Sequence, residues 1–242
     1  MAEWLASIMP NVVDYSSKFW SSCLATGQMF LIAGGFTLVL GSIFGVLLTV
    51  TKKGGIAENA AVYNLVNIVT NVFRSIPFVI LLIFLIPLTR AIVGTAIGVK
   101  GAIVPLVFGA VPFFTRQVEA ALANVSPGKI EAAAAMGSGK LGIIFRVYLH
   151  EWVPDLIRAV TITAISLIGL TTMAGAVGAG GIGSFALNYG NGQNHQDIVN
   201  ACVLILFATV IILQTIGNAL ARRTTNRKLL SFSGRTKTEA AK

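Results

Sequence analysis

Long apolar runs alternate along this chain with short stretches that contain charged residues. A helix that crosses a bilayer needs about 20 predominantly apolar residues. The apolar runs predict an all-α membrane protein with five transmembrane helices, at about residues 30–50, 68–89, 91–114, 157–177 and 198–221. The first run contains Gly41 and Gly45, and two small residues at this spacing let neighbouring helices pack closely.

Prolines interrupt two of the predicted spans. Pro77 and Pro87 lie in the second span, and Pro105 and Pro112 lie in the third. A proline in a helix leaves one backbone carbonyl without its usual partner, and in a bilayer neighbouring helices or water must supply one. We therefore expect these spans to be kinked and to line a channel within a helix bundle.

The cations are spread unevenly over the polar stretches. If the C-terminus is placed inside, 15 of the 18 lysines and arginines lie on the inner side, and Lys18, Arg90 and Lys100 lie outside. Lysine and arginine accumulate in the cytoplasmic loops of membrane proteins. This distribution predicts an N-out, C-in topology with an external or interfacial segment (residues 1–25), a cytoplasmic loop (120–157) and a basic cytoplasmic tail (222–242).

The composition agrees with a membrane protein, because 55% of the 242 residues are hydrophobic and 11% are charged, against about 25% charged in soluble domains. The formal net charge of +9 would suggest a nucleic-acid partner in a soluble protein. Here the cations belong to the cytoplasmic stretches, and no nucleic-acid partner is expected. Cys23 and Cys202 form no disulfide framework, and His150 and His195 are too isolated for a metal site.

The predicted cytoplasmic loop contains two short helical patterns joined by a glycine. Ser126 and Pro127 are typical of the cap and the first residue of a helix, and four alanines follow Glu131. Gly137 suits the left-handed turn that ends many helices, and Ser138 can cap a second helix. We predict one helix that ends at Gly137 and a second, amphipathic helix after it.

The same loop resembles the EAA loop of ABC importer permeases in the spacing of Glu131, Ala132, Ala133, Gly137 and Leu149. Val147 and His150 stand where this family usually has isoleucine and proline. The resemblance implies that the loop is a coupling helix, which docks into a groove on an ATP-binding subunit, and that these residues serve the coupling. The alternative is an ordinary amphipathic helix at the membrane surface.

Further stretches resemble the methionine-uptake branch of this family: residues 73–82, 87–98, 102–113 and 175–183. The resemblance implies a type I importer permease fold over residues 26–221, in the bacterial cell membrane, with a homodimer that forms the path for L- or D-methionine. It implies as partners two ATP-binding cassette subunits and an extracytoplasmic methionine-binding protein or lipoprotein. ATP and Mg would bind the cassette subunits, because this chain has no P-loop. No cofactor, metal or catalytic residue is expected in the chain itself.

Other functions are compatible with the composition. The chain could be an ABC importer permease for another small solute, or a secondary carrier driven by an ion gradient. A secondary carrier predicts carboxylates inside the spans or an inverted repeat, and neither is evident in the sequence. A membrane-embedded enzyme is disfavoured, because the spans contain no nucleophile–base arrangement and no pair of carboxylates.

Arg74 and Met173 are the candidate residues of a translocation pathway. Arg74 lies inside the second predicted span. Its long side chain can reach the cytoplasmic headgroups, which is the preferred interpretation, or face the pathway and bind a substrate carboxylate. Met173 stands among small residues, where a flexible thioether can either close a pore or pack in the core. Arg90 and Arg116 are interpreted as anchors at the span ends.

Overall fold

A computed structural model describes the backbone of residues 9–239, with the side chains of most of them. Side chains at positions 127, 141, 145, 146, 149–151 and 226–239 lie outside the description. Within residues 9–239 the regular structure is entirely helical: α2 (Pro10–Asp14), α3 (Ser16–Thr51), α4 (Ala60–Ser75), α5 (Phe78–Phe84), α6 (Ile86–Val93), α7 (Gly98–Ala123), α8 (Pro127–Ala135), α9 (Lys140–Gly142), α10 (Leu149–Ala174), α11 (Gly181–Phe185) and α12 (Gln196–Glu239). Three π-helical stretches complete it: η1 (Ile143–Tyr148), η2 (Gly175–Ala179) and η3 (Ala186–Asn191).

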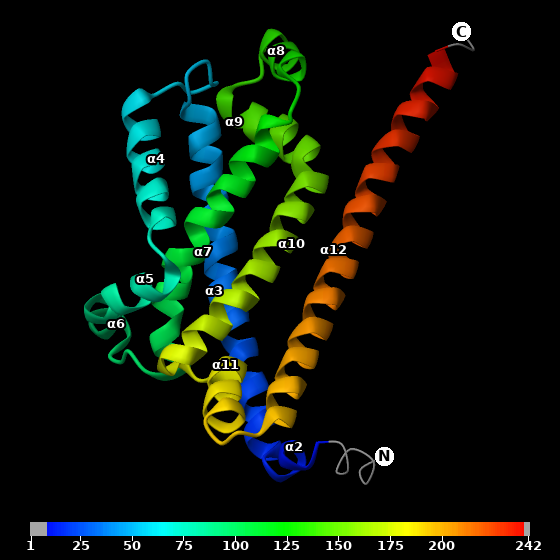
Figure 1. Cartoon of the computed structure of the whole chain (residues 1–242). Helices are drawn as coiled ribbons and strands as arrows, with labels where there is room; N and C mark the ends of the chain where they lie inside the picture. Colours follow the sequence, from blue (N-terminus) through cyan, green and yellow to red (C-terminus); the bar gives the residue numbers. More distant parts are fainter. Residues whose placement is uncertain (1–8, 240–242) are drawn as a thin grey trace.

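The helices α3 and α7 pack against each other along the middle of the bundle (Figure 1). Phe114 and Val118 of α7 are completely buried. A Cβ on Gly41 would come within 2.6 Å of the Phe114 ring, and a Cβ on Gly45 would overlap Val118. The two glycines therefore allow the close approach of helices that their spacing predicts.

Replacing Gly45 by leucine should lower the thermal stability of the protein. The new side chain would have to enter the space of Val118 and of the Thr115 carbonyl, and overpacking of this kind typically costs about 1–3 kcal/mol. Gly35→Leu is the matched control on the same helix, because no atom lies within 4 Å of a Cβ at Gly35. In detergent, the midpoint of heat unfolding should fall for Gly45→Leu alone. Equal midpoints for the two variants would contradict the close packing.

The kink predicted at Pro77 in the second span is confirmed, and it is a sharp break between two helices. α4 ends at Ser75 and α5 begins at Phe78, and the two helices are bent by 105° relative to each other. Ile76 is extended, with φ −87° and ψ 124°, which is the conformation favoured before a proline. Pro77 has no N–H group to continue the helical hydrogen bonds, so the chain turns sharply here (Figure 1).

The third span is displaced from its predicted position. α6 ends at Gly94, which takes the left-handed conformation with φ 79°, and a short non-helical stretch follows. The span therefore occupies residues 98–123 in α7 rather than residues 91–114. Its two prolines lie inside a continuous helix.

The last two predicted spans lie within longer helices. α10 begins at Leu149, before the predicted start of the fourth span, and it continues through Pro154. By length and composition, α3, α7 and the stretches Trp152–Ala179 and Gln196–Thr225 can each cross a bilayer, and the bent pair of α4 and α5 adds a fifth span when it is counted as one. This count agrees with the five spans predicted from the sequence.

The two ends of the bundle carry different elements (Figure 1). One end carries α8 and the C-terminal part of α12, and the other carries α2, α11 and the turn that leads into α12. We call them the α8 end and the α11 end. The first and last described helices, α2 and α12, begin and end at opposite ends of the bundle, as an odd number of spans requires.

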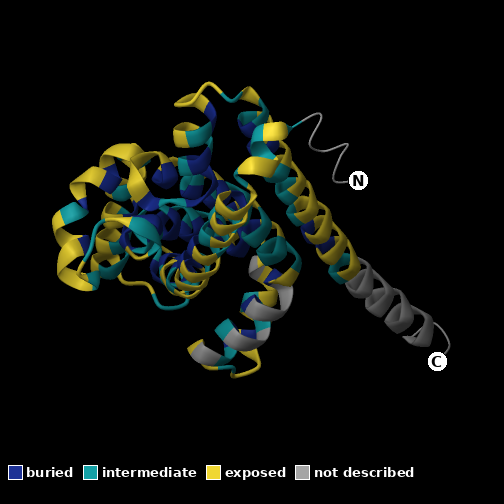
Figure 2. Cartoon of the chain, turned by 90° about the horizontal axis from the view of Figure 1, so that it is seen from below, coloured by how far each residue is buried: buried dark blue, intermediate teal, exposed yellow. Residues whose placement is uncertain are grey.

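Exposed residues follow α12 along its described length, whereas buried residues gather among the other helices (Figure 2). Only 11% of the most apolar part of α12 is buried, against 50% for α7. Most apolar side chains of α12 therefore face away from the subunit, as expected for a helix at the edge of a bundle that meets lipid or a second subunit.

Candidate functional site

The segment between α7 and α10 lies at the α8 end and holds the predicted coupling residues. Its first helix, α8, begins at Pro127 with Ser126 as the preceding cap residue, as predicted. The Ser126 side chain makes no hydrogen bond to the helix. The local sequence therefore sets the start of α8 mainly through the fixed backbone angle of the proline.

The end of α8 is set by Gly137, which has φ 79°. The N–H of Gly137 donates to the Ala134 carbonyl at 3.0 Å, and the N–H of Ser138 donates to the Ala133 carbonyl at 3.0 Å. This pair of hydrogen bonds is the Schellman motif, in which glycine is favoured at the left-handed position. The predicted role of Gly137 as a helix stop is confirmed.

The second helix of the loop differs from the prediction. Its cap residue is Gly139 rather than Ser138, because the Ser138 N–H already belongs to the end of α8. From α9 the chain continues through η1 into α10 without a break, so there is no separate second short helix. Leu149, one of the predicted coupling residues, is the first residue of α10, and its side chain lies outside the described part.

One face of α8 is anchored to the bundle. Ala133 is buried in a cluster with residues of α7, of the α7–α8 turn, of η1 and of α10, among them Val125, Ile143, Tyr148 and Trp152. Burial raises the pKa of the Tyr148 phenol above its ordinary value, so this group stays neutral. Because Ala133 packs in this cluster, movement of α8 would be passed directly to α7 and α10.

The other faces of α8 are open. Glu131, Ala132 and Gly137 are exposed. Met136 is 79% exposed, the largest exposed fraction of any large hydrophobic residue in the described part of the chain. Sequence reasoning missed Met136, because no pattern separates an exposed methionine after an alanine run from a core one. A carboxylate, small side chains and a flexible thioether on an anchored helix suit docking into a groove of another protein.

A cavity of about 230 Å³ lies at the break between α4 and α5. Arg74 belongs to the last turn of α4 and lines this cavity, which we call the Arg74 cavity. The other walls come from α4, α5, α7 and α10 and include Phe73, Phe78, Gly109, Phe113, Ser166 and Leu170. A cation among aromatic walls and a hydroxyl is a composition that suits an amphipathic ligand with a negative group.

Met173 lies on the cavity-lining face of α10. It follows Ser166 by seven residues and Leu170 by three, and both of these residues line the Arg74 cavity. Residues at these spacings share one face of a helix. Met173 is half exposed in the subunit. The face that lines the cavity therefore continues through Met173 toward the α11 end.

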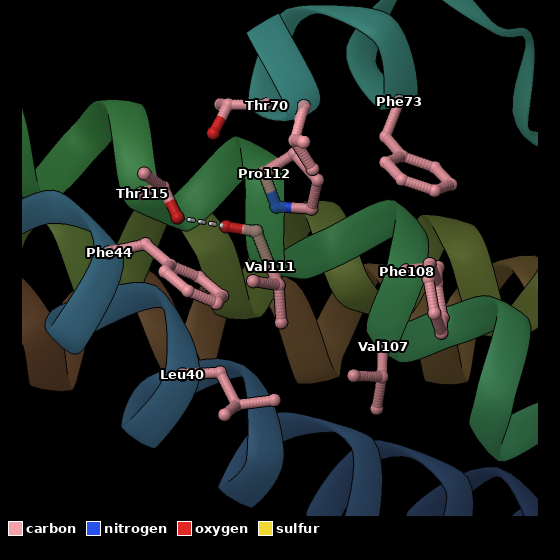
Figure 3. A pocket seen from close by; sticks show the side chains of 10 residues that line it. Leu40, Phe44, Thr70, Phe73, Val107, Phe108, Val111, Pro112 and Thr115 are labelled. Atoms are coloured by element: carbon pink, nitrogen blue, oxygen red, sulfur yellow. Dashed lines mark hydrogen bonds between the residues drawn. The ribbon is translucent and has the colours of Figure 1, made fainter. Parts of the chain in front are cut away.

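A second cavity, of about 280 Å³, lies between α3, α4 and α7 (Figure 3). Its walls are apolar apart from Thr70 and Thr115, and the Thr115 hydroxyl donates to the Val111 carbonyl at 2.8 Å. Phe73 lines both cavities, and its ring centroid lies 5.1 Å from that of Phe108. Phe73 is therefore part of the partition between the two cavities.

The family of binding-protein-dependent transport system inner membrane components matches residues 38–228 of this chain. The chain belongs to this family. The matched region contains the EAA-like loop and every residue that lines the two cavities. The chain is thus a multi-pass transport permease of the bacterial inner membrane. In the described part of the chain, no group of three or more His, Cys, Asp or Glu side chains could hold a metal ion.

Similar proteins cover most of this chain. It is 44% identical to the probable D-methionine transport system permease protein MetI of Vibrio cholerae, over 84% of this chain and 90% of that protein. It is also 44% identical to the methionine import system permease protein MetP of Bacillus subtilis, over 72% of this chain and 78% of that protein.

Solved structures share the fold. The MetNI methionine ABC transporter in an inward-facing conformation matches with a TM-score of 0.85 at 42% identity, over 87% of this chain and 98% of that chain. An amino acid ABC transporter crystallised with histidines matches at a TM-score of 0.71 and 15% identity, over 89% of this chain and 98% of that chain. The predicted fold class, an all-α importer permease with five spans, is confirmed.

Proposed function

We propose that this chain is the permease subunit of an ATP-driven importer and forms the membrane path for methionine, as the L- or the D-form. The observation that carries the proposal is the match to the MetNI methionine transporter over 98% of that chain at 42% identity. The names of the relatives from Vibrio cholerae and Bacillus subtilis point to the same substrate.

The complete importer contains two copies of this chain, two ATP-binding cassette subunits and an extracytoplasmic methionine-binding protein. ATP and Mg bind the cassette subunits, and this chain hydrolyses no ATP. The N-terminus lies outside and the α8 end faces the cytoplasm, which places 15 of the 18 cations inside. In this orientation α8 lies on the side where the cassette subunits are.

Transport follows alternating access. Closure of the cassette subunits around ATP moves α8. This segment presents Glu131, Ala132, Met136 and Gly137 to the groove of the cassette subunit. The movement passes through the buried face around Ala133 to α7 and α10. These helices line the Arg74 cavity, so it opens alternately to the two sides of the membrane. Arg74 binds the methionine carboxylate, the aromatic walls contact the thioether side chain, and Met173 narrows the path toward the α11 end.

The test is reconstitution of this chain in liposomes with its cassette subunit and the binding protein. ATP-dependent accumulation of labelled methionine is expected, and a cassette subunit that cannot hydrolyse ATP should abolish it. Uptake that needs an ion gradient and not ATP would support the secondary-carrier alternative. ATP-dependent uptake of another solute in place of methionine would agree with the permease assignment and contradict methionine as the substrate.

The topology has its own test. A reporter fused after Leu230 should be cytoplasmic, because this position lies in the C-terminal part of α12, among its cations, at the α8 end. An epitope inserted between Gly192 and Gln193 should be external, because this exposed turn lies at the α11 end. Detection of both on the same side of the membrane would contradict five spans.

A further inference from the structure

A cluster of polar side chains joins α4 to α7 beside the apolar cavity. The Arg116 guanidinium donates to the side-chain oxygen of Asn71 at 2.7 Å, to that of Asn67, and to a Glu119 carboxylate oxygen at 2.6 Å. Asn67 and Asn71 are one helical turn apart on α4, while Arg116 and Glu119 are one turn apart on α7. The Arg116 and Glu119 side chains are only 20% and 22% exposed. The sequence alone suggested a simple span-end anchor, whereas the structure shows a clamp between two helices.

On α7, the clamp lies within the part of the helix that holds the coupling segment. Phe114 and Val118, which flank Arg116 in the sequence, belong to the same buried cluster as Ala133 of α8 and Tyr148. A displacement of α8 that moves this cluster must therefore also move Arg116.

On α4, the clamp lies next to the Arg74 cavity. Asn71 precedes Arg74 by three residues, so the two are one turn apart, and Phe73 lies between them. The position of Asn71 thus sets where Arg74 and Phe73 stand in the cavity wall.

Packing holds α4 less firmly than it holds α7. Thr70 is its only buried residue, and the helix is separated from α5 by the break at Ile76 and Pro77. The apolar cavity of about 280 Å³ separates part of α4 from α3 and α7. Without the clamp, α4 could shift relative to α7, because unfilled space on one side forfeits packing contacts.

We propose that Arg116 is a positioning residue that transmits movement of the coupling segment from α7 to α4, and so to the Arg74 cavity. This inference rests on the proposed function, because it concerns how the same pathway is opened. The forked guanidinium suits the task, since it holds two amide oxygens and a carboxylate at once in a fixed geometry.

The test compares Arg116→Met with Arg158→Met in the complete reconstituted importer. Arg158 is the matched control, because it also lies within a long span helix but is 60% exposed and bonded only weakly to Asp155, at 3.4 Å. Arg116→Met should retain its cassette subunits and hydrolyse ATP at close to the normal rate. The number of methionine molecules imported per ATP should fall about tenfold, a size typical of mutations in a coupling network. Arg158→Met should keep the wild-type ratio.

Two milder variants distinguish transmission from a merely structural role. Arg116→Lys keeps the charge and loses the fork, and Asn71→Ala removes one acceptor at an exposed position. Both should lower the import-to-ATP ratio to intermediate values in normally assembled complexes. An unchanged ratio in Arg116→Met, or a parallel loss of assembly and ATP hydrolysis in all three variants, would overturn the proposal.

A spectroscopic measurement keeps the inference separate from the substrate assignment. Spin labels at Leu65, an exposed residue of α4, would report the distance between the two copies of α4 in the importer. Vanadate trapping should change this distance in the wild type and change it much less in Arg116→Met. If the distance changes more in the wild type than in Arg116→Met, but the wild type imports no methionine, the proposed substrate is refuted and the clamp is supported. Equal changes in the two proteins would refute the clamp.

Discussion

Gly137→Asp should leave the permease inserted in the membrane and abolish coupled methionine uptake. Gly137 has φ 79°, a conformation that costs an ordinary L-residue about 1–2 kcal/mol. No atom lies within 4 Å of a Cβ at this position, so the aspartate can be accommodated without a clash. Its charge, however, stands at the C-terminus of α8, where the helix dipole disfavours an anion by about 0.3–1 kcal/mol. It would also be carried into the proposed groove of the cassette subunit.

The matched control is Gly94→Asp. Gly94 also ends a helix with φ 79°, and no atom lies within 4 Å of its Cβ position, but it follows α6, away from α8. Purified complexes of both variants would be compared for retained cassette subunit, ATP hydrolysis and uptake in liposomes. Gly137→Asp should lose the subunit or its stimulated hydrolysis, and Gly94→Asp should not. Full retention and normal coupled uptake in Gly137→Asp would remove the coupling role from this loop.

The parts of the fold that the sequence predicts well depend on local signals. The start of α8 at Pro127 and its end at Gly137 were predicted, because a proline in the first turn and a left-handed glycine act through their own backbone angles. The close contact at Gly41 and Gly45 was predicted for a similar reason, since small residues at this spacing have few other uses in a membrane helix.

The effects of the prolines were predicted only in part, because the same residue type has different outcomes in different surroundings. Pro77 ends α4 with a bend of 105°, whereas Pro105 and Pro112 lie inside the unbroken α7. α7 is packed on several sides by α3, α4 and α10, and these contacts keep the helix continuous where a hydrogen bond is missing. The end of α4 is more exposed, at Arg74 and Ser75, and the extended conformation favoured before a proline prevails there.

The candidate site was predicted only as far as single residues allow. Arg74 and Met173 stand out as unusual residues in their spans, but their relation to one cavity depends on the bend after α4 and on the face of α10. The clamp at Arg116 joins residues about 45 positions apart in the sequence, and no periodicity links Asn71 to Arg116. Long-range pairing of this kind becomes visible only when the helices are placed in space.

Arg74→Ala should reduce methionine uptake by roughly 10- to 150-fold at saturating methionine and binding protein. A hydrogen bond between a guanidinium and a carboxylate is worth about 1.5–3 kcal/mol, and this free energy corresponds to the stated factor. ATP hydrolysis should persist, because Arg74 lies at the α4–α5 break and not among the exposed residues of α8. Arg90→Ala is the control, since Arg90 is an exposed arginine on α6 that is not among the residues lining the Arg74 cavity.

Arg74→Lys separates carboxylate binding from the alternative, in which Arg74 only reaches lipid headgroups. A lysine reaches headgroups as well as an arginine does, so the headgroup role predicts wild-type uptake for Arg74→Lys. A lysine cannot form the paired hydrogen bonds that a guanidinium makes to a carboxylate, so the pathway role predicts uptake between those of Arg74→Ala and the wild type. Initial uptake rates for the wild type, Arg74→Lys, Arg74→Ala and Arg90→Ala would be measured at equal amounts of assembled importer. If Arg74→Lys matches the wild type and Arg74→Ala matches Arg90→Ala, Arg74 does not bind the substrate, and the cavity beside it is not the methionine site.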